Sequence, residues 1–228
     1  MPKIQRKSIF LLLFFTLLFT ACFNENREVL KAKKVFLEGN ASEENYNLAQ
    51  QYFIQGEYED ALIFDLKQLE EDLKYYADES LEIALDYNNI GLDYDELKNH
   101  KKALEYYFRS MKIDEEILED NNTERSTTYY NIASSYNALE EYNSAIKYYH
   151  KALAIDEEIL GQYHQDVWAE YESLALAYEN VSKPNLSLKY WKKTLAYKEH
   201  TYGAYTEDSN QTRVKVEILQ KKLQRKVI

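Results

Sequence analysis

The stretch that decides the fold is residues 130–145, which read YNIASSYNALEEYNSA, because the chain repeats their pattern. An apolar residue, a small residue, a tyrosine and a second small residue recur in four copies at an interval of 42 residues. The four columns are Leu48, Ile90, Ile132 and Leu174; Ala49, Gly91, Ala133 and Ala175; Tyr52, Tyr94, Tyr136 and Tyr178; and Ala61, Ala103, Ala145 and Ser187. This self-similarity predicts a repeat protein over residues 41–208.

The columns predict that each copy is a helical hairpin. In the first copy, Leu48, Tyr52 and Ile54 recur at spacings of two to four residues, which we interpret as one apolar helix face. The small residue after Leu48 allows a second helix to approach closely, and Gly56 breaks the two helices. One hairpin cannot bury both faces of its helices, so neighbouring hairpins are expected to stack.

The spacing of the small residue, the tyrosine and the second small residue resembles the tetratricopeptide repeat. The interval of 42 residues is longer than the common 34 and resembles the long-helix variety found in kinesin light chains. Residues 161–167, GQYHQDV, resemble the linker of that variety, and His164 is expected to belong to a linker or helix start. The resemblance implies an all-α fold: a right-handed α-solenoid of about four helix-turn-helix repeats with N- and C-terminal capping helices.

The N-terminus has the layout of a secretory signal. Lys3, Arg6 and Lys7 precede an apolar run over residues 9–19, and Ala21 precedes Cys22. Residues 18–22, LFTAC, resemble the lipobox of bacterial lipoproteins, which implies that Cys22 becomes the lipid-bearing N-terminus and the membrane anchor. The alternative is an uncleaved anchor helix. Because Cys22 is the only cysteine, no disulfide can form within one chain.

The residue that follows the cysteine is Phe23 rather than aspartate. This resembles sorting to the outer membrane, so the expected location is a bacterial cell envelope, with the protein lipid-anchored in that membrane. The predicted segments are a signal peptide (1–21), a tether (22–27), an N-terminal helix (28–40), four repeats (41–82, 83–124, 125–166 and 167–208) and a C-terminal capping helix (209–228).

Charge and composition argue against several functions. The formal net charge of −11 disfavours nucleic acid, whose phosphates require a basic surface. The four histidines lie in different hairpins, without the spacing of a helical metal site. The chain has five glycines and no glycine-rich phosphate loop. Glutamate pairs such as Glu157-Glu158 are interpreted as solvated surface, with Ile117 and Ile159 on the buried side. We therefore predict no enzyme activity, no cofactor and no metal.

The remaining candidate is a binding surface. The resemblance implies that the first helix of each hairpin lines a concave groove, and an asparagine amide can both donate to and accept from a peptide backbone. The candidate groove residues are Tyr46, Asn47, Asn88, Asn89, Tyr130, Asn131 and Asn137. With acidic neighbours such as Asp95, Glu96 and Glu179, the predicted partner is a protein or extended peptide with a neutral or basic segment.

Alternative interpretations stay open at this point. The asparagines can instead bond to a neighbouring repeat. The 22 tyrosines suggest a glycan- or small-ligand-binding lipoprotein. The four tyrosines of the repeated column, however, are expected in the core, because they recur on the apolar helix face. An unclosed end of the solenoid would suggest a structural lipoprotein that assembles with itself.

Overall fold

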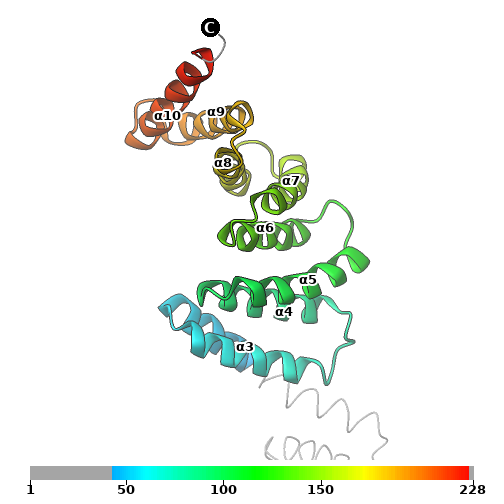
Figure 1. Cartoon of the computed structure of the whole chain (residues 1–228). Coiled ribbons are helices and arrows are strands. Elements are labelled where there is room, and N and C mark those ends of the chain that lie inside the picture. The colour runs from blue at the N-terminus through cyan, green and yellow to red at the C-terminus, as the bar shows by residue number, and fades with distance from the viewer. Residues whose placement is uncertain (1–42, 226–228) are drawn as a thin grey trace, which may run out of the picture.

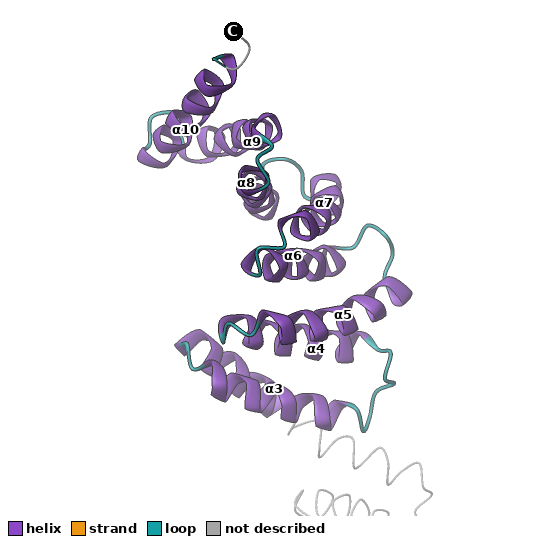
Figure 2. Ribbon diagram, viewed as in Figure 1, coloured by secondary structure: helices purple, strands orange, loops and turns teal. Residues whose placement is uncertain are grey.

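The computed structural model describes residues 43–225, and these form nine helices and no strand (Figures 1 and 2). The predicted signal peptide, Cys22, the tether, the helix at 28–40 and the last three residues lie outside this part of the chain. The helices are 43–55, α3 (Tyr58–Asp72), α4 (Leu81–Glu96), α5 (His100–Ile117), α6 (Thr123–Ala138), α7 (Tyr142–Ile159), α8 (Gln165–Asn180), α9 (Pro184–Tyr202) and α10 (Glu207–Gln224).

The helices pack in chain order, so that each hairpin stacks on the next (Figure 1). Helices α4 and α5, α6 and α7, and α8 and α9 form hairpins, and α10 packs on α9. The prediction of an all-α repeat solenoid is confirmed. Between residues 43 and 225, no helix is both long enough and apolar enough to cross a bilayer.

The hairpin turns share one backbone conformation. Gly56, Lys98, Glu140 and Ser182, spaced 42 residues apart, have φ angles of 79°, 61°, 62° and 56°. In each turn, the backbone N–H of the residue after the left-handed one donates to the carbonyl five positions before it, as from Asn99 to Tyr94 at 2.8 Å. This bond satisfies a carbonyl at the end of the first helix. The predicted break at Gly56 is confirmed, and Lys98, Glu140 and Ser182 form the equivalent turns of the later hairpins. Only the first turn has a glycine, which adopts a positive φ without strain. In the other three turns, the packing of the hairpins holds a non-glycine residue in the left-handed conformation.

Inside a hairpin, the small column makes room for an aromatic ring of the second helix. Gly91, Ala133 and Ala175 are buried on α4, α6 and α8. A Cβ atom at Gly91 would lie 2.5 Å from Cε1 of Tyr107, whose side chain is fully buried on α5. The ring of Tyr107 therefore occupies the space that a side chain at Gly91 would need.

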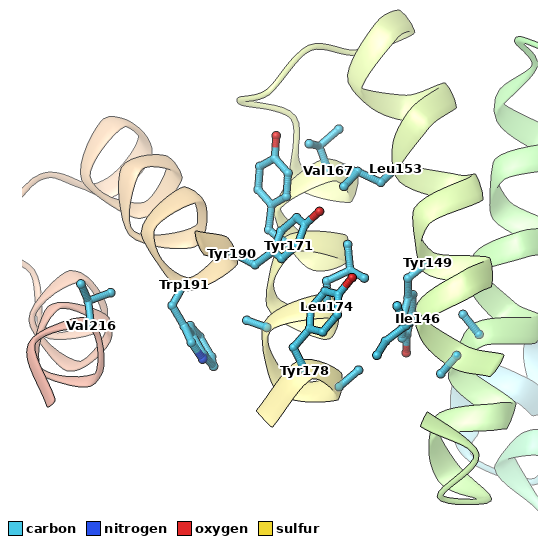
Figure 3. Packing of buried hydrophobic residues seen from close by; sticks show 14 residues of the cluster. Ile146, Tyr149, Leu153, Val167, Tyr171, Leu174, Tyr178, Tyr190, Trp191 and Val216 are labelled. Carbon is cyan, nitrogen blue, oxygen red and sulfur yellow. The ribbon is translucent and has the colours of Figure 1, made fainter. Parts of the chain in front are cut away.

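The largest apolar cluster joins the last two hairpins to α10 (Figure 3). It includes Leu153 of α7, Leu174 of α8, Trp191 of α9 and Val216 of α10, all of them buried. The ammonium of Lys215 lies 3.8 Å from the centre of the Trp191 ring. Because α10 covers the outer face of α9 through these contacts, it closes the described end of the solenoid.

Tyrosines on the first helices connect successive helices. The hydroxyl of Tyr129 on α6 donates to Glu115 of α5 at 2.7 Å, and the ammonium of Lys151 on α7 lies 4.4 Å from the centre of the Tyr129 ring. Lys151 also approaches Glu115 at 3.4 Å. The same triad recurs one repeat later as Glu157, Tyr171 and Lys193. These tyrosines are part of the scaffold that holds neighbouring repeats together.

Three isoleucines depart from their predicted burial. Ile54 is 82% exposed, because its spacing of two residues from Tyr52 turns it about 200° away on a helix. Ile117 and Ile159, predicted on the buried side, are 45% and 42% exposed, because each is the last residue of its helix. The buried residues near these ends are Ile113, Asp114, Ile155 and Asp156. Two aspartates thus lie in the interface between repeats.

Candidate functional site

Two equivalent pockets lie between successive first helices. The α4–α6 pocket, of about 310 Å³, is lined by residues of α4, α5 and α6. The α6–α8 pocket, of about 230 Å³, is lined by residues of α6, α7 and α8. Every lining residue of the α6–α8 pocket lies 42 positions after one of the α4–α6 pocket. Thr127 lies between them and lines both. The repeat therefore presents the same hollow twice on one face.

Two of the candidate groove residues line these pockets. Asn88 lines the α4–α6 pocket, and Tyr130, one repeat later, lines the α6–α8 pocket. The amide nitrogen of Asn131 donates to the amide oxygen of Asn88 at 3.0 Å, which joins α6 to α4. At the equivalent place between α6 and α8, the hydroxyls of Tyr130 and Ser173 are 3.5 Å apart. These two contacts, Asn131–Asn88 and Tyr130–Ser173, each join residues 43 positions apart and link successive first helices. We call them the polar ladder.

The remaining candidates are placed differently. Tyr46 and Asn47 are exposed on the helix at 43–55, and Asn47 lines a shallow depression there. Asn89 is buried, so its amide does not lie on the open face. Asn137 is half-buried on α6. The Asn131–Asn88 bond is of the kind that the alternative interpretation anticipates, an asparagine bonded to a neighbouring repeat. The role of these residues in partner binding stays a prediction.

The deep wall of each pocket contains a buried aspartate of the second helix. Asp114, in the α4–α6 pocket, accepts a hydrogen bond of 2.7 Å from the hydroxyl of Thr128. Burial raises the pKa of Asp114, and the bond from Thr128 opposes that rise. In the α6–α8 pocket, Asp156 accepts a hydrogen bond from Ser126, and burial likewise raises its pKa.

Glu170 replaces the threonine in the α6–α8 pocket and makes its chemistry different. Its side chain is 1% exposed and faces Asp156. Among the described residues, no donor lies within hydrogen-bond distance of either Glu170 oxygen. Burial and the negative charge of Asp156 raise the pKa of Glu170 to about 9. At neutral pH the two carboxyl groups therefore share a proton, which bonds one to the other.

Two of the expected groove acids are used within the fold. Asp95 accepts hydrogen bonds from Ser135 at 2.7 Å and from Tyr107 at 3.3 Å, so it links α6 and α5 to α4. Glu179 accepts a bond of 2.7 Å from the indole N–H of Trp191. Both carboxylates stabilise the packing of helices. The acidic groups at the pocket mouths are instead Glu82, Glu124 and Asp166, all exposed.

In the part of the chain that the structure describes, no group of three or more His, Cys, Asp or Glu side chains is placed to hold a metal ion. The paired acids Asp156 and Glu170 are 6% and 1% exposed, and both line the wall of the α6–α8 pocket.

Comparisons with known proteins agree with this geometry. Two models of the tetratricopeptide repeat family match residues 42–116 and 126–159. This chain is a tetratricopeptide repeat protein. Solved structures of kinesin-light-chain-like repeats share its fold. No curated protein matches the chain.

Three solved structures are similar in fold to the chain at low sequence identity. The kinesin-light-chain-like repeats of "Podosopora anserina" are 16% identical, with a TM-score of 0.66, covering 80% of this chain and 96% of that one. BtubC (BKLC) of P. vanneervenii is 19% identical, with a TM-score of 0.69, covering 87% and 78%. MamA is 22% identical, with a TM-score of 0.56, covering 75% and 86%.

Sequence reasoning missed the buried acids of these tetratricopeptide repeats, although a signal was present. Asp72, Asp114 and Asp156 form a column at the repeat interval. Adjacent acids in a helix were interpreted as solvated surface, yet a column that keeps aspartate through three repeats indicates a shared environment. The partner column is Asp86, Thr128, Glu170 and Thr212, in which Thr128 and Glu170 decide whether the aspartate receives a donor.

Proposed function

We propose that this tetratricopeptide repeat protein is a non-catalytic scaffold that binds an extended protein segment along α4, α6 and α8. The observation that carries the proposal is the pair of equivalent pockets, one repeat apart on the same face. Side-chain sites repeated at a fixed interval suit an extended ligand, because successive parts of such a ligand meet the same surroundings.

The polar ladder supports recognition of a peptide backbone. The Asn131–Asn88 bond uses one N–H and one amide oxygen, and each amide retains other hydrogen-bonding groups. Asn88 also lines the α4–α6 pocket, so it lies beside the space that a ligand would occupy. Each further hydrogen bond to a ligand backbone would contribute about 0.5–1.5 kcal/mol. The ladder therefore fixes the groups that a bound segment would meet.

Charge favours a neutral or basic segment. The chain carries a formal net charge of −11, and the exposed acids Glu82, Glu124 and Asp166 lie at the pocket mouths. Acidic groups near a site attract basic partners, and added salt screens this attraction. The same charges repel phosphates, so we infer that nucleic acid is not the partner.

We further propose that the scaffold is held at a bacterial envelope membrane, in the outer membrane, by lipid on Cys22. The basic, apolar and small order of residues 1–21 before the cysteine supports this. The Cys22→Ser variant should appear in the soluble fraction or remain unprocessed, as fractionation and mass spectrometry would show. Normal cleavage with equally firm membrane attachment would contradict the lipid anchor.

The binding face can be tested with one substitution at the wall that both pockets share. The full-length chain would first be used to capture its partner from the producing cells, and the partner would then be titrated. Because Thr127 is exposed and lines both pockets, Thr127→Trp should fill their mouths and weaken binding at least about tenfold, or 1.4 kcal/mol.

The control is Glu105→Trp, an exposed position on the second helix α5 that lines neither of these pockets. It should leave the affinity unchanged. Equal affinities of both variants and the unmodified chain would move the partner off this face.

A further inference from the structure

The α6–α8 pocket contains a buried acid pair whose charges are not balanced by neighbouring residues. Glu170 of α8 and Asp156 of α7 are 1% and 6% exposed and face each other. The other charged groups that act on them are Asp166 and Glu157, both acidic, and His164 on the Asp156 side. Ser126 donates to Asp156, but no donor among the described residues reaches Glu170. With its one shared proton the pair still carries a net negative charge, so the pocket wall needs a further donor or a cation.

The α4–α6 pocket shows how the same fold meets this need internally. At the position equivalent to Glu170 it has Thr128, whose hydroxyl donates to Asp114 at 2.7 Å. Its aspartate therefore already has a donor, and Leu81 and Leu85 add apolar wall. The lining residues of the α6–α8 pocket all have equivalents in the α4–α6 pocket, and Thr128 against Glu170 is the difference that gives the aspartate a threonine donor in one pocket and a second carboxyl group in the other.

We propose that the α6–α8 pocket is a subsite for the ammonium or guanidinium group of a basic side chain, with Glu170 and Asp156 as its anionic partners. The subsite belongs to the binding face proposed above, and the inference rests on that function. It adds that the bound segment places a lysine or arginine here, and a neutral side chain in the α4–α6 pocket.

The chemistry of the pocket favours a basic side chain over other ligands. The lining residues Tyr130 and Ala169 offer apolar surface for a methylene stem, while a charged head can reach polar groups at its end. An anion would meet Asp156, Asp166 and Glu170. A metal ion is disfavoured because no set of three ligand side chains is formed within residues 43–225.

Binding of a cation should be linked to the proton of the acid pair. The pKa of Glu170 is raised to about 9 by burial and by Asp156, so the pair carries a proton at neutral pH. A bound ammonium replaces that proton as the positive group between the carboxylates. The affinity for a basic side chain should then rise about tenfold per pH unit below pH 9, with one proton released for each ligand bound.

The test uses alanine methyl groups of the full-length chain in detergent as separate reporters of the two pockets. Ala169 lines the α6–α8 pocket and Ala84 lines the α4–α6 pocket. The probes are a blocked peptide with one lysine between glycines, the same peptide with Nε-acetyl-lysine, and cadaverine as a free amine. NMR titrations would be recorded at pH 6, 7 and 8.

We expect the lysine peptide to shift the Ala169 methyl signal saturably at pH 8, with Ala84 unaffected and the affinity falling at lower pH. Acetylation should weaken binding at least about tenfold, because it removes the charge. Glu170→Thr, which copies the natural threonine at 128, should abolish the shift and its pH dependence. Glu172→Thr, on the same helix but half-exposed, should retain both. Unchanged Ala84 signals in each variant show that the chain is folded.

Equal responses to the lysine and acetyl-lysine peptides, or an unchanged response in Glu170→Thr, would overturn the proposal. A response to cadaverine without one to the lysine peptide would overturn the assignment to a peptide. The proposed function fails separately: if no partner is captured while the lysine peptide still shifts Ala169, the subsite stands and the scaffold role does not.

Discussion

Replacing Glu170 with threonine should make the protein more stable at pH 8 and slightly less stable at pH 5. In the folded chain the pKa of Glu170 is raised from 4.5 to about 9 by burial and by Asp156. The folded state therefore holds this proton more tightly than the unfolded chain does. Stability is greatest below pH 4.5 and falls as the pH rises toward about 9.

The size of the effect follows from the width of this window. Each pH unit inside it costs about 1.4 kcal/mol, so the step from pH 5 to pH 8 removes at most about 4 kcal/mol. The shorter side chain of threonine leaves a small void at a position that is 1% exposed, which costs about 1 kcal/mol. The hydroxyl can donate to Asp156, as Thr128 does to Asp114. Relative to the unmodified chain, the free energy of unfolding of the variant should be higher by about 2–3 kcal/mol at pH 8 and lower by up to about 1 kcal/mol at pH 5.

Urea denaturation followed by circular dichroism at pH 5, 6, 7 and 8 would measure both curves. The unmodified chain should become less stable with pH more steeply than the variant. Some slope should remain in the variant, because burial also raises the pKa of Asp86 to about 8 and of Asp93 to about 9. Glu172→Thr, at a half-exposed site on the same helix, should follow the unmodified chain. Parallel curves for Glu170→Thr and the unmodified chain would refute the buried acid pair.

Three further substitutions test the packing of the hairpins by the same denaturation measurement. Gly91→Ala should destabilise the chain by up to about 2 kcal/mol, because the added Cβ lies 2.5 Å from the Tyr107 ring, and the overpacking cost of about 1–3 kcal/mol is offset by roughly 1 kcal/mol gained in helix propensity. A gain in stability would show that the ring moves freely. Ala133→Leu, at a fully buried position, should cost about 1–3 kcal/mol or more. Asn137→Leu, at a half-buried one, should cost far less, and equal losses would mean that the helix faces are misassigned.

The repeat interval determined most of the fold from the sequence. Leu48, Ile90, Ile132 and Leu174 predict one helix face four times, and each hairpin meets nearly the same neighbours in the solenoid. A local rule that holds for one repeat therefore holds for the others. This is why the turn predicted at Gly56 recurs at Lys98 and Glu140, where the residue is not glycine.

The candidate site was determined less completely. Asn88 and Tyr130 were predicted to face the groove, and they line the two pockets. Asn89 shares that prediction but is buried. Neighbouring helix residues differ by about 100° in direction, so the exact rotation of each first helix decides which of two adjacent side chains stays open. A column in the sequence does not fix that rotation.

Tertiary structure alone decided which columns meet across repeats. Asn131 bonds to Asn88, and Glu170 faces Asp156, because the stacking of one hairpin on the next sets the offset between their helices. The sequence shows that a residue is ionisable, but the residues packed around it determine whether its charge is solvated. Glu170 looks like surface in the sequence; its place between α7 and α8 makes it a buried acid with a raised pKa.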